Sequence, residues 1–211
     1  MIALLRVIPA FALTALLLAI VPGQGVAMIL RQSIVGGRRA ALTSVAGNSV
    51  GLLIWGAASA IGLSQVFAHS HTAYNVLKYA GVLFLLFLSI QTLWSLRLAY
   101  GKFDYEGSAK IGIGPAFRLG LLTNLTNVKA AVFAVAFIPQ FVPKSFSLGL
   151  GIFILSMVQS AVSTSWYSFL IQIVDRAAPQ LAKPKVRRAL TAFSALGILV
   201  LAVSLLVASP R

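Results

Sequence analysis

One lysine, Lys129, is the residue of this sequence best suited to chemistry inside a membrane. It is the only charged residue between positions 119 and 143, a stretch that is otherwise apolar or weakly polar. A lysine at the centre of a bilayer costs roughly 2.5–3.5 kcal/mol on insertion scales, so an ionisable residue at that depth is a functional candidate. Its ammonium could bind a substrate carboxylate or repel cations. It could equally donate to free backbone carbonyls, and the sequence leaves these alternatives open.

Uncharged amides accompany this lysine. Asn124 and Asn127 precede it in the same apolar stretch, and Gln24 follows a proline and a glycine in the first one. Amides supply both donors and acceptors, as recognition of a zwitterion requires, but they could instead bond the backbone of their own helices. The candidate binding residues are Pro22, Gly23, Gln24, Gly25, Asn48, Asn124, Asn127 and Lys129.

The composition indicates that lipid surrounds the elements that carry these residues. Of the 211 residues 59% are hydrophobic and 9% are charged, whereas soluble domains carry about 25% charged residues. A transmembrane helix needs about 20 largely apolar residues. We therefore predict an all-α integral membrane protein with one domain, 1–211. The six expected helices are 2–35, 40–67, 74–97, 116–142, 146–174 and 187–208.

The first apolar stretch also raises the question of a cleaved signal peptide. Apolar residues resume directly after Gly25. We expect this stretch to be a retained helix.

The basic residues predict the orientation of the helices. The gaps after the first, third and fifth expected helices hold twelve lysines and arginines, whereas the opposite side holds Arg6, Lys78, Lys144 and Arg211. Cytoplasmic loops are rich in lysine and arginine. Both termini are therefore expected on the periplasmic side of a bacterial inner membrane.

That topology relates the two halves of the chain by inversion. The first repeat covers about 1–97, a cytoplasmic loop about 98–115 and the second repeat about 116–211. Each repeat has an interruption in its first helix, at the Pro22–Gly25 turn and around Thr123–Lys129. Inverted three-helix repeats with broken helices at the midplane are typical of secondary transporters.

Two further patterns lie in the second and fifth expected helices. Gly47 and Gly51 form a face that permits close helix packing, within one chain or between two, and Asn48 could bond across to the first or fourth helix. The fifth helix has polar residues at helical spacing, which could line a pathway or join helices: Ser156, Gln159, Ser160, Ser163, Thr164 and Tyr167.

Other classes of function find little support. The chain has no cysteine, and His69 and His71 alone are too few for a metal site. The net charge of +14 is spread over loops and not along one stripe, which argues against nucleic-acid binding. No hydrolase motif, P-loop or nucleophile–base pair is present. Asp175 lies beside Arg176 and is interpreted as a boundary residue.

Five segments together resemble the lysine exporter / homoserine–threonine exporter (LysE/RhtB) family. They are VPGQG (21–25), GGRRA (36–40), GNSVG (47–51), GLLTNLTNVKAA (120–131) and FIPQF (137–141). The resemblance extends over nearly the whole chain in the order and spacing of the family. It implies a six-helix exporter of amino acids or related metabolites, driven by the proton-motive force, with no cofactor.

The resemblance also bears on the site. Pro22 and Gly23 correspond to the start of the family's PGP element, and Asn127 and Lys129 to its NPK element. Gln24 replaces the second proline of the first element and Val128 the proline of the second. These departures affect the expected substrate more than the fold. The partners implied are a small-molecule substrate, a coupling proton and the bilayer, with a homo-oligomer left open. A membrane scaffold of the same fold without transport activity stays the alternative.

Overall fold

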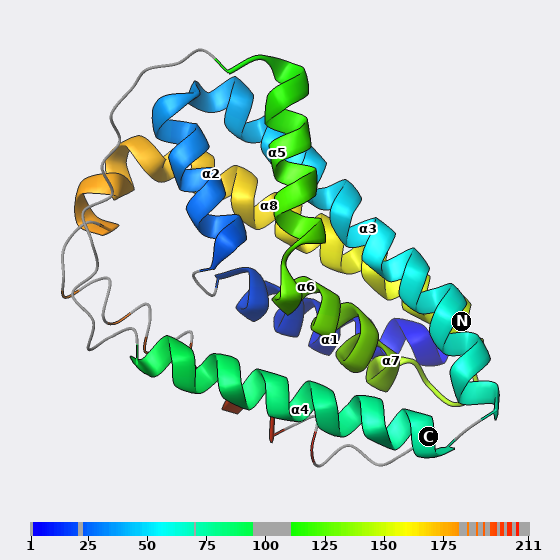
Figure 1. Cartoon of the computed structure of the whole chain (residues 1–211). Helices are drawn as coiled ribbons and strands as arrows, with labels where there is room; N and C mark the ends of the chain where they lie inside the picture. Colours follow the sequence, from blue (N-terminus) through cyan, green and yellow to red (C-terminus); the bar gives the residue numbers. More distant parts are fainter. Residues whose placement is uncertain are drawn as a thin grey trace.

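The computed structural model describes residues 2–20, 23–69, 71–94 and 111–181, and scattered positions between 185 and 206. Within these residues every regular element is helical (Figure 1). In chain order the elements are α1 (Ile2–Ile20), α2 (Gln24–Val35), α3 (Gly37–His69), α4 (His71–Trp94), α5 (Ile113–Leu125), α6 (Val128–Val132), the π-helix η1 (Phe133–Phe137), α7 (Ile138–Phe141) and α8 (Leu148–Leu181).

Several of these helices are suited to cross a membrane. By length and hydropathy, Ile2–Ile20, Gly37–Gly62 and Leu148–Ile173 qualify singly, and Ile113–Leu125 with Val128–Phe141 qualifies as a bent pair. The prediction of an all-helical, multi-pass membrane protein is confirmed to this extent. Of the expected sixth helix, 187–208, the structure describes only scattered positions, and these are helical.

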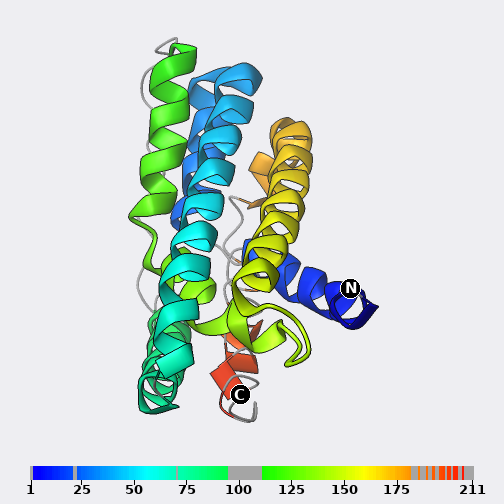
Figure 2. The ribbon, with the colours of Figure 1, turned by 90° about the vertical axis from the view of Figure 1, so that its right-hand side faces the viewer.

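The first expected helix is divided in the structure. The helix α1 ends at Ile20 and α2 begins at Gln24 after Gly23, whose backbone is extended. Figure 2 shows α1, in dark blue, running across the direction of α3 and α5 and projecting from the bundle. The next turn is sharp because Gly37 adopts φ +74°, a conformation that glycine reaches without steric cost.

The fourth expected helix is also divided. It begins at Ile113 and not at 116, because Pro115 falls in the first turn, where backbone N–H groups need no helical partner. Only Thr126 and Asn127 separate α5 from α6, a shorter interruption than the seven-residue segment 123–129 suggested. The two helical parts are bent by 57°. The π-helix that follows was not predicted from the sequence.

Glycines allow α3 and α5 to touch along their backbones. A Cβ on Gly47 would overlap the carbonyl oxygen of Phe117, and a Cβ on Gly120 would overlap that of Ser44. The Ser44 hydroxyl donates to the carbonyl of Ala116 at 2.9 Å. In the described residues, then, the Gly47 face packs within one chain.

Two apolar cores hold the remaining helices. The larger one joins α1 to η1 and α7 through packed rings of Phe11, Phe133, Phe137 and Phe141. The helix α8 adds Ile152 and Leu155 to this core. The smaller one joins α2, α3 and α8 around Ile29, Val45 and Tyr167. Large apolar side chains such as those of Leu13, Ile61, Leu83 and Met157 point outward, as expected for surfaces that face lipid.

Candidate functional site

The side chain of Lys129 reaches from α6 to the C-terminal end of α1. Its Nζ donates a hydrogen bond to the carbonyl oxygen of Leu18 at 3.2 Å. In a continuous α-helix that oxygen would accept from the N–H of residue 22, but residue 22 is proline and has no N–H. An ammonium from the second half of the chain therefore replaces the missing donor. The partial negative charge of a helix C-terminus also favours a cation there.

Asn127 fixes the start of α6 beside this contact. Its Oδ1 accepts from the backbone N–H of Lys129 at 3.1 Å, and its carbonyl oxygen accepts from the N–H groups of Ala130 and Ala131. Asparagine is a preferred N-cap residue for this reason. In this conformation the Asn127 amide bonds its own helix, which was one of the two alternatives raised by the sequence.

Asn48 and Asn124 pair across α3 and α5. The Asn124 Nδ2 donates to the Asn48 Oδ1 at 3.0 Å, and both residues are 2% exposed. The sequence predicted that Asn48 could bond across to the first or fourth expected helix, and the bond to the fourth is confirmed. Gly51 makes room for the pair, because a Cβ there would lie 2.8 Å from the Asn124 Oδ1. That Oδ1 is buried and has no hydrogen-bond partner among the described residues.

A second carbonyl, that of Ala134, also lacks its regular backbone donor because the residue that would supply it is a proline. In the i→i+5 pattern of η1, the oxygen of Ala134 would pair with the nitrogen of Pro139, which carries no hydrogen. The Ser59 hydroxyl of α3 donates to that oxygen at 2.8 Å. Side-chain donors thus compensate for the missing N–H of Pro22 and of Pro139, as buried backbone groups in a membrane require.

Gly25 lies in the first turn of α2, where side chains of α3 and α8 converge. A Cβ on this buried glycine would stand 3.0 Å from the Tyr167 hydroxyl oxygen and 3.8 Å from the Asn48 Oδ1. Tyr167 is 7% exposed. The structure therefore brings together Gly25, Asn48 and Asn124, which the sequence singled out, and adds Tyr167 to them.

The residues that precede Gly25 in the predicted site do not add side chains to this cluster in the described part of the chain. Gln24 is exposed at the start of α2, and Gly23 caps that helix through its carbonyl, which accepts from the N–H of Ala27. Pro22 lies outside the described residues.

The polar face of α8 mainly joins helices. The Thr164 and Ser49 hydroxyls are 2.5 Å apart, and the Ser160 hydroxyl donates to the Ser49 carbonyl at 3.4 Å. The Ser156 hydroxyl donates within its own helix. Gln159 differs, because its Oε1 is buried without a hydrogen-bond partner in the described part of the chain.

Helices long and apolar enough to cross a membrane, with buried polar side chains between them, are features of a membrane transporter. A family model for LysE type translocators matches residues 16–209. The chain belongs to this family and is a transporter, not an enzyme.

Characterised and uncharacterised relatives match over most of the chain. The homoserine/homoserine lactone efflux protein of Salmonella typhimurium is 35% identical over 206 residues, 96% of each chain. The leucine efflux protein of Salmonella choleraesuis is 27% identical over 158 residues, 74% of each chain. The membrane protein YrhP of Bacillus subtilis is 25% identical over 170 residues, 77% of this chain and 80% of that protein. No solved structure shows a significant match.

Proposed function

We propose that this chain exports a small zwitterionic amino acid, or a derivative of one, across the bacterial inner membrane by proton-driven alternating access. The observation that carries the proposal is the hydrogen bond from the Lys129 ammonium to the Leu18 carbonyl. It joins the end of α1 to the start of α6, and each of these positions lies at a helix interruption. Secondary transporters bind substrate at such interruptions, where unpaired backbone and charged side chains line a pathway.

In the proposed architecture the chain forms six spans in two inverted halves of three. The α1–α2 interruption belongs to the first half and the α5–α6 interruption to the second. Support for the inversion comes from the place of the two breaks, because each falls in the first expected helix of its half.

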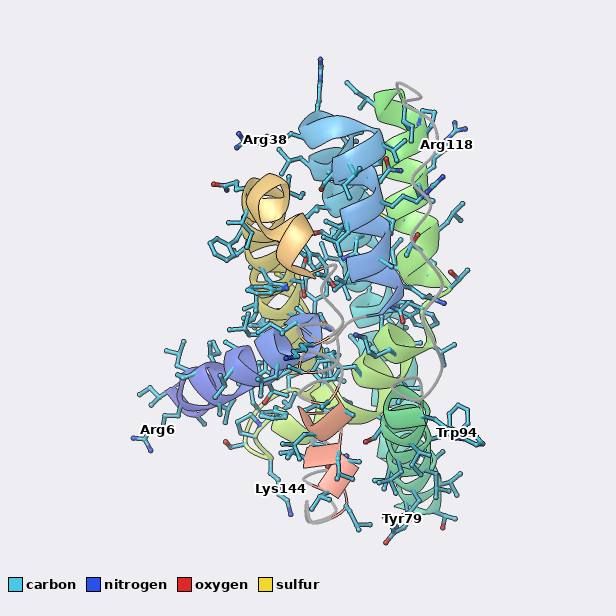
Figure 3. All side chains as sticks on the ribbon, turned by 90° about the vertical axis from the view of Figure 1, so that its left-hand side faces the viewer. Arg6, Arg38, Tyr79, Trp94, Arg118 and Lys144 are labelled. Atoms are coloured by element: carbon cyan, nitrogen blue, oxygen red, sulfur yellow. The ribbon has the colours of Figure 1, made fainter. Side chains whose placement is uncertain are left out.

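The distribution of basic side chains supports the proposed orientation. Figure 3 shows Arg38 and Arg118 toward one end of the molecule and Arg6 and Lys144 toward the other. The expected loops at the end that contains Arg38 and Arg118 hold more lysine and arginine than those at the other end. This end would therefore face the cytoplasm. Both termini would then be periplasmic.

The Lys129–Leu18 contact suggests how a zwitterion would bind. A substrate carboxylate would take the Lys129 ammonium as its partner, through a charge-assisted hydrogen bond. The substrate ammonium would take the carbonyl oxygens at the end of α1, where a positive charge is favoured. Binding would thus exchange an internal contact between the two halves for contacts with the substrate, and this exchange would permit α1 to move.

The relatives suggest which substrates to test. Two of them are named for efflux of homoserine, homoserine lactone or leucine. We propose that a small neutral amino acid of this range is carried here. The coupling ion is proposed to be a proton that enters as the substrate leaves.

Export is tested with the purified chain in liposomes loaded with radiolabelled homoserine, leucine or lysine. We expect efflux of a neutral amino acid that is accelerated by an inwardly directed proton gradient and slowed by a protonophore. Liposomes without protein, loaded with the same amino acids, give the background rate of efflux. If none of the amino acids leaves faster than background although the protein is inserted and folded, the exporter proposal is wrong and the scaffold alternative is favoured.

A further inference from the structure

The side-chain amide of Gln32, near the end of α2, is buried and unpaired in the described part of the chain. The residue is 0% exposed, and neither its Nε2 nor its Oε1 has a hydrogen-bond partner there. The Oε1 lies against Gly36, where an added Cβ would stand 2.8 Å from it. Unpaired polar groups are unfavourable inside a membrane protein, because water does not replace the missing partners. Gln32 therefore makes this conformation less stable than an apolar residue of its size would.

Gln32 belongs to a face of α2 that packs on α8. It stands seven residues after Gly25, close to two helical turns, so both point in nearly the same direction. An added Cβ on Gly25 would lie 3.0 Å from the Tyr167 hydroxyl oxygen. Ile29, between Gly25 and Gln32, packs in the smaller core with Tyr167 and Ile171. We call the contact of these five residues the α2–α8 interface (Figure 1).

A second unpaired amide lies farther along α8. Gln159 is 2% exposed, and its Oε1 has no hydrogen-bond partner among the described residues. At about 3.6 residues per turn, its side chain points in a direction between those of Leu155 and Tyr167. Leu155 packs in the larger core with Leu18, whose carbonyl oxygen accepts from Lys129. The helix α8 thus carries Gln159 from the α2–α8 interface toward the Lys129 contact.

The other end of the α2–α8 interface lies toward Arg38. The helix α2 ends at Val35, directly before the turn that leads to Arg38, and Figure 3 shows Arg38 at one end of the molecule. Gln32 is about 10 Å nearer to this end than Gly25, at the rise of an α-helix. From the Arg38 end inward, the order is therefore Gln32, then Tyr167, then Gln159.

We infer that substrate reaches Lys129 from the Arg38 end along the α2–α8 interface, past Gln32 and Gln159, and that this route is closed in the present conformation. Amides donate and accept, so they can pair with both ends of a zwitterion without a fixed charge that would retain it. Separation of α2 from α8 would let water or substrate pair with both amides, which offsets part of the free energy of opening. The inference rests on the proposed export function and adds the route and the residues that line it.

The first test uses single cysteines, because the chain has none of its own. The probe is a membrane-impermeant methanethiosulfonate added to one side of vesicles, and Arg38→Cys identifies the side of the Arg38 end. From that side we expect Gln32→Cys to react at least about tenfold faster than Ala116→Cys, because a minor open state exposes only the first. Ala116 is the matched control, since it is also 0% exposed and lies in α5 two residues from Arg118, at the same end (Figure 3).

The second test asks whether the route carries substrate. Modification of Gln32→Cys with the charged reagent should reduce efflux of homoserine or leucine from liposomes to the background rate. The same treatment of Ala116→Cys should leave efflux unchanged. If Gln32→Cys does not fold, Ile171→Cys replaces it, because Ile171 is 4% exposed on the facing side of the α2–α8 interface.

The outcomes separate the route from the export function. Equal rates of modification for Gln32→Cys and Ala116→Cys, in a chain that exports, would overturn the route and leave export intact. Full efflux after complete modification of Gln32→Cys would overturn the route too. A wild type that moves no amino acid would instead overturn the proposed function.

Discussion

The Lys129 ammonium donates to the carbonyl oxygen of Leu18, 111 residues earlier in the chain, across a distance of 3.2 Å. The contact joins the two interruptions of the fold and pairs a charge with the end of a helix dipole. Proline at position 22 removes the regular backbone donor to the Leu18 carbonyl, and Lys129 supplies another donor. The effect of replacing one of these residues should therefore depend on which residue stands at the other position. This dependence leads to predictions for both residues.

Lys129→Met should abolish amino-acid export while the protein stays folded in the membrane. Methionine keeps most of the length of the side chain but cannot bind a carboxylate or donate to Leu18. We expect flux to fall at least about a hundredfold, as for loss of a charged substrate contact of about 3 kcal/mol. Efflux from liposomes is the measurement, with size-exclusion chromatography as the check of folding.

The control for this variant is Lys144→Met, which removes an exposed lysine after α7. It should export normally. Undiminished flux in Lys129→Met would show that transport does not require the Lys129 ammonium.

Pro22→Ala should partly restore the stability lost in Lys129→Met. Alanine at position 22 supplies an N–H that can donate to the Leu18 carbonyl when the ammonium is gone. In a double-mutant cycle we expect a favourable coupling of about 0.5–2 kcal/mol between the two changes. Thermal unfolding of the four proteins in detergent measures it. Strictly additive effects would mean that the two residues do not serve the same carbonyl.

The sequence indicated where the helices break, and it singled out Lys129 as a candidate functional residue. Both were possible because prolines, glycines and a lysine in an apolar run can be recognised from residue type alone. It did not predict the partner of Lys129, although counting four residues back from Pro22 leads to Leu18. A backbone carbonyl carries no residue-type signal. Tyr167 was recognised only as one of several polar residues on its helix, since its contact with Gly25 depends on how α2 and α8 pack.

Ser59→Ala should destabilise the protein by about 1 kcal/mol, the order of a hydrogen bond between membrane helices. The change leaves the Ala134 carbonyl without its donor. Pro139→Ala, which provides a backbone N–H at that turn, should reduce the loss. Thermal unfolding again gives the measurement, and Ser165→Ala, at an exposed position of α8, is the control. A loss of stability unaffected by Pro139→Ala would contradict the proposed role of Ser59.

Gly47→Val should prevent the close approach of α3 and α5. Any Cβ at this position would overlap the Phe117 carbonyl, and backbone atoms cannot move aside as a flexible side chain can. We expect loss of the monodisperse folded protein in detergent. Ala46→Val adds similar volume to the neighbouring exposed position and should have little effect. Normal folding of Gly47→Val would show that α3 and α5 can separate without harm.

The membrane orientation can be tested directly, because the chain contains no cysteine. Arg38 and Lys144 are exposed toward different ends of the molecule (Figure 3), so Arg38→Cys and Lys144→Cys report on the two sides of the membrane. The excess of basic residues near Arg38 predicts that this end is cytoplasmic. A membrane-impermeant maleimide should therefore label Lys144→Cys in intact cells and Arg38→Cys only after the inner membrane is disrupted. Labelling of Arg38→Cys in intact cells would reverse the proposed orientation.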